Sequence, residues 1–152
     1  MSLEGAIAVT RFGLGASKNE IEIASHLPKA WLLEQLTARG TKNIAFDGLA
    51  SSSNAYRVAK AYRRERKAMI GDDKAVASKK YGKTVRSIFQ AKTQARAVYA
   101  AQTETPFHER LTRFWSNHFS VSARSRNTRL LAGAYEREAI RPHILGGFSD
   151  LA

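Results

Sequence analysis

The sequence contains no cysteine, only three prolines and no long apolar run. Without cysteine the chain has no disulfide, no thiolate nucleophile and no cysteine-ligated metal. No apolar run approaches the roughly eighteen residues that a membrane-spanning helix needs, so no transmembrane segment is predicted. The N-terminus also lacks a basic segment followed by an apolar core and a small-residue cleavage site, which is the pattern of a secretory signal peptide.

These absences leave the cellular compartment open. The opening residues Met1, Ser2 and Leu3 fit an expression-vector remnant, and a removed export signal would leave no trace. The lack of cysteine is compatible with either a reducing or an oxidising compartment. The sequence therefore predicts a cytoplasmic location only by default, with an exported protein as the alternative.

What the chain does contain is the mixture typical of a folded domain. Its 152 residues are 43% hydrophobic and 25% charged, and a chain of that size buries roughly two-thirds of its unfolded surface. This composition excludes a wholly disordered chain, a collagen and a disulfide scaffold. Helical periodicity runs throughout, and no stretch alternates as a strand does. We therefore predict an all-α fold, an irregular array of about six to seven helices in a single helical region over residues 1–152.

Local signals mark several helix boundaries. The segment from Leu3 to Phe12 predicts a first helix. Ser17 with Glu20 three residues later forms a capping box that opens a second helix, and Pro28 opens a third. Residues 40–53 are small, polar or scattered apolar, and they predict a loop.

The positive charge is very unevenly distributed along the chain. Twenty-five Lys and Arg against thirteen Asp and Glu give a net charge of +12. Residues 57–99 carry thirteen basic and three acidic side chains, so this basic helical segment contributes +10 of that total. Residues 1–56 sum to zero and residues 100–152 add +2. Any function inferred from the charge therefore belongs to residues 57–99.

Within the basic segment, cations follow one side of two amphipathic helices separated by a polar break. The predicted anion-binding residues are Arg57, Lys60, Arg64, Lys67, Lys79, Lys83 and Arg86. Such rows could bind the phosphates of a nucleic acid or an anionic membrane. The plainer interpretation, that they are solvated faces of core helices or of an exposed insertion, is favoured because no nucleic-acid-binding motif accompanies the charge. Four tyrosines at helical spacing are expected to pack inward rather than stack on bases: Tyr56, Tyr62, Tyr81 and Tyr99.

The clearest predicted helix begins at Thr105 and Pro106, which suit the N-cap and the first helical position. His118 projects from its apolar face, together with Phe107, Leu111, Phe114, Trp115 and Phe119. A histidine on such a face is most often a satisfied core residue, and a general base or metal ligand is the alternative. No metal site is predicted, because no two histidines are three or four residues apart on a helix. The sequence likewise contains no complete nucleotide-binding or nucleophile motif, so it leaves the identity of any cofactor unknown.

Four segments stand out as a set: Ala6–Gly15 (AIAVTRFGLG), Trp31–Leu36 (WLLEQL), Phe107–Ser122 (FHERLTRFWSNHFSVS) and Glu136–Leu151 (EREAIRPHILGGFSDL). Together they resemble the N-terminal portion of the domain of unknown function 1800 family, bacterial proteins of uncharacterised activity. The most specific part is the core from Phe114 to Phe119, followed by the run from Arg141 to Phe148. The basic segment lies where we expect the family to vary, so the resemblance assigns it no role.

The resemblance implies a larger helical protein, because members of the family are much longer and continue with further helices. We therefore expect this chain to be an N-terminal fragment whose uncovered apolar faces lead to self-association. It is expected to contribute a buried polar centre to the larger fold, formed by Trp115, Asn117, His118, Arg141 and His143. One alternative is part of an enzyme whose active site needs the C-terminal region, and the other is binding of nucleic acid or an anionic surface through residues 57–99. The family implies no reaction.

Overall fold

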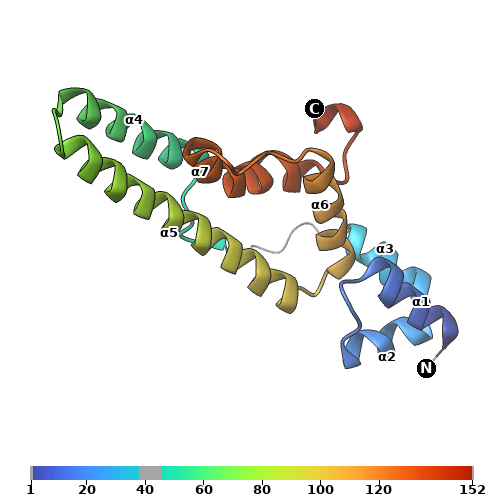
Figure 1. Cartoon of the computed structure of the whole chain (residues 1–152). Helices are drawn as coiled ribbons and strands as arrows, with labels where there is room; N and C mark the ends of the chain where they lie inside the picture. The colour runs from blue at the N-terminus through green and yellow to red at the C-terminus, as the bar shows by residue number, and fades with distance from the viewer. Residues whose placement is uncertain (1, 38–45, 152) are drawn as a thin grey trace.

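The computed structural model describes residues 2–37 and 46–151, apart from the side chain of Lys18. Within these residues the chain forms seven α-helices and no strand, which confirms the predicted all-α array (Figure 1). Their bounds are α1 Leu3–Phe12, α2 Lys18–His26, α3 Pro28–Thr37, α4 Ser52–Ala68, α5 Asp73–Gln102, α6 Pro106–His118 and α7 Arg126–Tyr135. None of these helices combines the length and the apolar character needed to cross a membrane.

The predicted helix boundaries in the N-terminal third are confirmed. The first helix spans the predicted residues, the third begins at Pro28, and the capping box of Ser17 and Glu20 opens α2. Of the predicted loop, residues 40–45 lie outside the described residues. Its other end is shorter than predicted, because Ser51 caps a helix that already begins at Ser52.

Helices α1, α2 and α3 form a small three-helix unit. Gly5 is buried where α1 crosses α2, and a Cβ atom there would lie 2.6 Å from the Cα of Ser25. Only glycine allows this close approach. The core of the unit is made of Ala8, Val9, Ala24 and Trp31.

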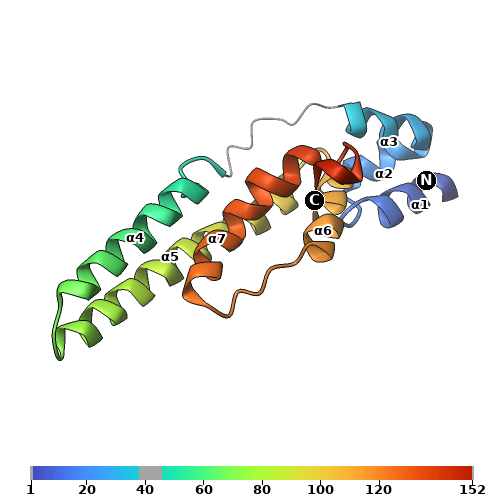
Figure 2. The ribbon, with the colours of Figure 1, turned by 90° about the horizontal axis from the view of Figure 1, so that it is seen from above.

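Helices α4 and α5 form a long antiparallel hairpin, which we call the arm (residues 52–102). Its turn contains Gly71 at φ 60°, a left-handed conformation that favours glycine. The arm extends away from the three-helix unit, and α7 lies alongside the half nearer to it (Figures 1 and 2). The three helices share a core of Ala55, Ala59, Tyr81, Val85 and Leu130.

Helix α6 joins the two halves of the molecule. The side-chain oxygen Oε1 of Gln35 in α3 accepts a hydrogen bond of 2.8 Å from the backbone N–H of Phe107. Arg110 donates to the carbonyl of Gly13, also at 2.8 Å, just beyond the end of α1. These contacts use backbone groups at helix ends, which have no partner within their own helix.

Helix α7 does not end as a regular helix. It continues into a π-helical turn over Glu136–Ile140 and then a short 3₁₀ turn over Arg141–His143. π-helical turns are rare in proteins, and those that occur often lie at functional sites. This turn rests on a third core made of Ile140, Ile144 and Leu151, against which Leu111, Trp115, Phe119 and Tyr135 pack.

Candidate functional site

The centre of the molecule holds a buried ion pair between α6 and the turn that follows α7. The side chain of Glu109 is fully buried, and its Oε2 lies 2.6 Å from Nη1 of Arg141, whose side chain is 9% exposed. Charge-assisted hydrogen bonds of this length are among the strongest in proteins. The pair therefore joins α6 to the C-terminal turn.

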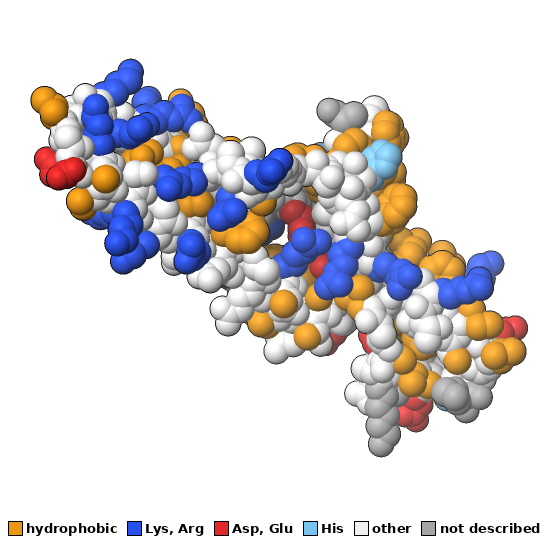
Figure 3. Space-filling model, in the orientation of Figure 1, with side chains coloured by type: hydrophobic (Ala, Val, Ile, Leu, Met, Phe, Trp, Pro, Cys, Tyr) orange, Lys and Arg blue, Asp and Glu red, His pale blue; other side chains and the backbone are white. Residues whose placement is uncertain are grey.

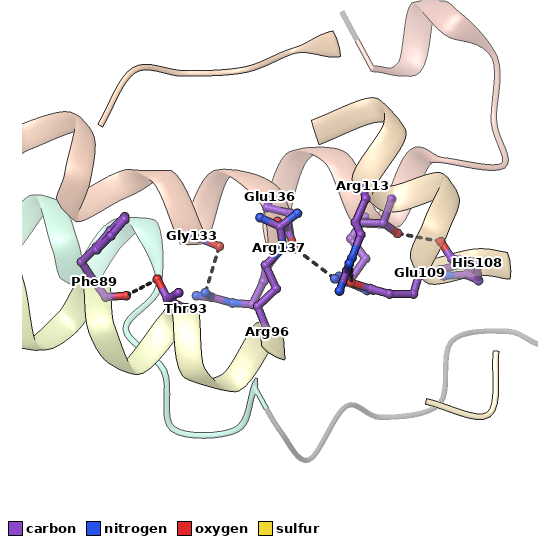
Figure 4. A network of polar contacts seen from close by, with 11 residues as sticks. Phe89, Thr93, Arg96, His108, Glu109, Arg113, Gly133, Glu136 and Arg137 are labelled. Carbon is purple, nitrogen blue, oxygen red and sulfur yellow. Dashed lines mark hydrogen bonds and ion pairs between the residues drawn. The ribbon is translucent and has the colours of Figure 1, made fainter. Parts of the chain in front are cut away.

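A second carboxylate extends this pair to α5. Nη2 of Arg141 lies 3.0 Å from Oε1 of Glu136, and the other oxygen of Glu136 lies 2.9 Å from Nε of Arg96. Figure 4 shows Arg96 reaching from its helix toward Glu136. The π-helical turn starts at Glu136, so the irregular helix end carries both Glu136 and Arg141 into the network.

Arg141 also packs against two neighbouring aromatic rings. Its guanidinium carbon lies 5.0 Å from the centroid of Phe46 and 5.0 Å from that of Tyr99. Burial by itself would lower the pKa of Arg141, but its hydrogen bonds with Glu109 and Glu136 and the charges of both carboxylates outweigh that cost and raise it. Arg141 is thus a fixed positive charge.

Some polar atoms of the network make no hydrogen bond within the described part of the chain. Arg113 approaches Glu109 to 3.5 Å, an ion pair without a hydrogen bond. Glu109 Oε1, Arg113 Nε and Arg141 Nε are buried and have no hydrogen-bond partner among the residues that the structure describes. Arg96, Arg113 and Arg141 face two carboxylates, which leaves the charge network with a net charge of +1. Such an arrangement suits the joining of helices better than proton transfer, because each carboxylate is fixed by arginine.

A buried lysine lies beside the network. Nζ of Lys92 in α5 donates a hydrogen bond of 2.9 Å to the carbonyl of Leu130 in α7. A Cβ atom at Gly133 would lie 2.5 Å from Cδ of Lys92, so the lysine stem occupies the space that a side chain would need. Burial, followed by the charge of Arg137, lowers the pKa of Lys92. The small hollow at this point, about 140 Å³, is also lined by Glu136.

The structure separates the residues of the predicted polar centre. Arg141 alone joins the buried charge network, and Trp115 is partly buried among aromatic rings. The expectation of burial is wrong for Asn117, His118 and His143, which are exposed. His118 packs edge-on against Trp115 at 5.7 Å and against Phe119 at 4.9 Å, on the outside of the molecule. Whether any of these residues has a functional role stays a prediction.

The difference arises from the face that α6 buries. The sequence pattern placed the apolar aromatic side chains inward, but Phe114 is 58% exposed. The fully or largely buried positions of α6 are Pro106, Glu109 and Thr112. The carboxylates Glu109 and Glu136 were therefore missed, and the one local signal for Glu109 was an oppositely charged Arg113 four residues later.

Among the described residues, no group of three or more His, Asp or Glu side chains is placed to hold a metal ion. Next to the network, His108 is half-buried, and burial followed by the charge of Arg141 lowers its pKa, against the opposing effect of Glu109. A neutral imidazole at this position is consistent with its mainly positive surroundings.

The arm carries the second candidate site. All seven cations predicted for anion binding are exposed. Four more exposed cations lie on the same two helices: Arg63, Arg66, Lys74 and Lys80. Against these eleven the arm has three exposed carboxylates, Glu65, Asp72 and Asp73, so its exposed side chains carry a net charge of +8. Figure 3 shows Lys and Arg side chains gathered over the arm, whereas hydrophobic side chains are more frequent over α6, the C-terminal turn and the α1–α3 unit.

The tyrosines of the arm are largely engaged in packing. Tyr62 and Tyr81 stack with their ring centroids 4.0 Å apart, and Tyr81 donates a hydrogen bond to Asn127 of α7. Tyr99 packs on Phe46. The prediction of inward packing is confirmed for these three, and it is wrong for Tyr56, which is 58% exposed.

Comparison with known proteins identifies the family. The chain belongs to the family described as protein of unknown function (DUF1800), whose model matches residues 7–152. The match covers nearly the whole chain and confirms the resemblance predicted from the four sequence segments. Neither the comparison with curated proteins nor the comparison with solved structures finds a match.

Proposed function

We propose that in this member of the family the arm binds the phosphate backbone of nucleic acid. The observation that carries the proposal is the net charge of +8 on the exposed side chains of a helical hairpin that extends from the rest of the chain. Neutralising phosphates with Lys and Arg releases counterions from the nucleic acid, and this release favours binding. The rest of the chain contributes little net charge, so the electric field of the arm would also orient the protein as it approaches the nucleic acid.

The spacing of the cations fits an extended phosphate lattice. Arg57, Lys60, Arg64 and Lys67 recur every three or four residues, so they share a side of α4 over about 15 Å. Duplex nucleic acid carries one negative charge per about 1.7 Å of its axis, so several phosphates lie within reach of this row. A single cation on a helix could not contact several phosphates at once.

The mode of recognition expected is contact with the backbone rather than with bases. Three of the four tyrosines of the arm are engaged in packing and one, Tyr56, is exposed, so stacking on several successive bases has little support. Contacts with phosphate carry no sequence information. An anionic membrane is disfavoured because the most exposed apolar residue of the turn, Ile70, is followed closely by Asp72 and Asp73.

Fluorescence anisotropy with a labelled duplex of arbitrary sequence tests the proposal. The outer variant combines Arg57→Gln, Lys60→Gln and Arg64→Gln. Its matched control, the off-arm variant, combines Arg11→Gln, Lys29→Gln and Arg124→Gln, which removes the same charge from exposed residues elsewhere. We expect the outer variant to bind about tenfold more weakly or worse at about 100 mM salt, and its log–log salt slope to fall by about 2 to 3.

Three outcomes would contradict this function. The first is no duplex binding by the unmodified chain at about 50 mM salt. The second is an equal loss of affinity in the outer and off-arm variants, which would mean that net charge alone is responsible. The third is binding to phosphatidylserine vesicles without binding to the duplex, which would assign the arm to a membrane surface.

We also infer a structural role for the charge network of Glu109, Glu136, Arg96, Arg113 and Arg141. Its members come from α5, α6 and the turn after α7, so the network supports the packing of these elements against one another. Unfolding measurements on variants of Glu109 test this role. A variant that lost no stability would contradict it.

A further inference from the structure

The arm contains a hollow whose lining residues are mostly Lys and Arg. It has a volume of about 460 Å³ and is lined by Tyr62, Arg63, Arg66, Lys67 and Lys74. Four of the five lining residues carry a positive charge, and none carries a negative one. Three of these cations, Arg63, Arg66 and Lys74, lie outside the rows that the sequence pattern singled out.

A second hollow between the same two helices differs from it in chemistry. This second hollow, also about 460 Å³, is lined mainly by apolar residues such as Val58, Met69 and Val76. Its charged lining residues are the carboxylates Glu65 and Asp73 and one cation, Lys80. Tyr62 is shared by both. The hairpin thus places two of its three carboxylates in one hollow and concentrates cations in the other.

The start of α7 adds to the positive environment near the cationic hollow. Arg126, the first residue of α7, donates a hydrogen bond of 2.8 Å to the side chain of Ser78. Ser78 lies one helical turn along α5 from Lys74. Arg126 thus brings one more positive charge close to this part of α5.

We propose that this hollow binds two or more linked phosphate groups, as in a polyphosphate chain. Several cations around one hollow favour a ligand with several negative charges held close together, and guanidinium groups match phosphate oxygens in bidentate geometry. The linked phosphates can come from inorganic polyphosphate or from a nucleic-acid backbone. If the phosphates belong to a nucleic-acid backbone, the inference rests on the proposed function, and the hollow is the point at which the arm anchors that backbone.

Calorimetric titration with inorganic tripolyphosphate tests the hollow directly. The hollow variant combines Arg63→Gln, Arg66→Gln and Lys74→Gln, and the outer variant is its matched control, since both remove three exposed cations from the arm. We expect the hollow variant to bind tripolyphosphate about tenfold more weakly or worse, and the outer variant to change affinity less than about threefold. We also expect orthophosphate to bind much more weakly than tripolyphosphate, because it offers only one phosphate group.

Each outcome decides the proposal. No binding of tripolyphosphate by the unmodified chain, equal losses in the two variants, or equal affinity for orthophosphate would overturn it. Selective loss in the hollow variant, together with competition between tripolyphosphate and the duplex, would support it with nucleic acid as the source of the phosphates. Selective loss without any duplex binding would support the hollow as a polyphosphate site while the proposed function fails.

Discussion

Glu109 Oε2 and Arg141 Nη1 lie 2.6 Å apart, although the two residues are separated by 32 positions in the sequence. The contact is made where α6 meets the turn that follows α7. Glu109 has no exposed side-chain surface, so its charge depends on Arg141 and Arg113 for compensation. The stability of the chain should therefore respond strongly to the loss of either partner of this pair.

Replacing Glu109 by Gln is expected to destabilise the chain by about 3–5 kcal/mol, because it leaves the buried Arg141 with one carboxylate fewer. The free energy of unfolding from urea denaturation measures this loss. Glu34→Gln, at an exposed position of α3, is the matched control and should stay within about 0.5 kcal/mol of the unmodified chain. A loss below about 1 kcal/mol for Glu109→Gln would mean that the network contributes little to stability.

Much of the fold could be predicted because its signals are local. The capping box of Ser17 and Glu20, the helix-opening Pro28 and the polar break between the two basic helices, where the chain turns at Gly71, each act within a few residues. Helical periodicity without strand alternation was enough to predict an all-α array. These elements depend little on where other helices pack.

The candidate site could not be predicted to the same degree, because it depends on distant partners. Glu109 pairs with Arg141, and Glu136 with Arg96 forty positions earlier. The π-helical turn also changes the direction in which residues after Glu136 point, and a regular helical pattern does not anticipate it. His118 was placed inward from its helical neighbours, but its face of α6 lies partly at the surface.

The cationic rows of the arm were easier to predict than its hollow. Arg57, Lys60 and Arg64 form a pattern along one helix and are all exposed. The hollow combines Arg63 and Arg66 with Lys74 from the facing helix, and that combination depends on how the hairpin pairs. The distribution of charge along the sequence identifies the basic segment, whereas the pairing of α4 with α5 determines which cations line one hollow.

Gly133→Ala is expected to destabilise the chain by about 1–3 kcal/mol, because the new Cβ atom would overlap the stem of Lys92. In a Lys92→Ala background the same substitution should cost less, because the contacts with Cδ and Cγ of the lysine at 2.5 and 3.1 Å are gone, although the Cβ atom of residue 92 would still lie 2.9 Å from the new Cβ atom. A double-mutant cycle measured by urea denaturation checks this coupling. Equal costs of Gly133→Ala in the two backgrounds would show that the steric explanation is wrong.

His118→Gln is expected to change the free energy of unfolding by less than about 0.5 kcal/mol, because His118 is exposed. Trp115→Ala should cost about 2 kcal/mol or more, since the indole packs against the rings of Phe119 and Phe148 and against the third core. Thermal and urea unfolding of the two variants measure the contrast. A large loss for His118→Gln would restore the predicted core role of this histidine.

The lowered pKa of His108 predicts a pH dependence of stability. Burial and Arg141 disfavour the imidazolium in the folded chain, so below about pH 6.5 the unfolded state binds more protons than the folded state. The free energy of unfolding should therefore fall as the pH drops below this value. Above this value His108 should no longer make the free energy of unfolding depend on pH. His108→Gln should make the dependence between about pH 7 and pH 5 shallower, whereas His26→Gln, which removes an exposed imidazole, serves as the control. Urea unfolding at several pH values checks the difference, and equal slopes for His108→Gln and the unmodified chain would show that His108 titrates alike in the folded and unfolded states.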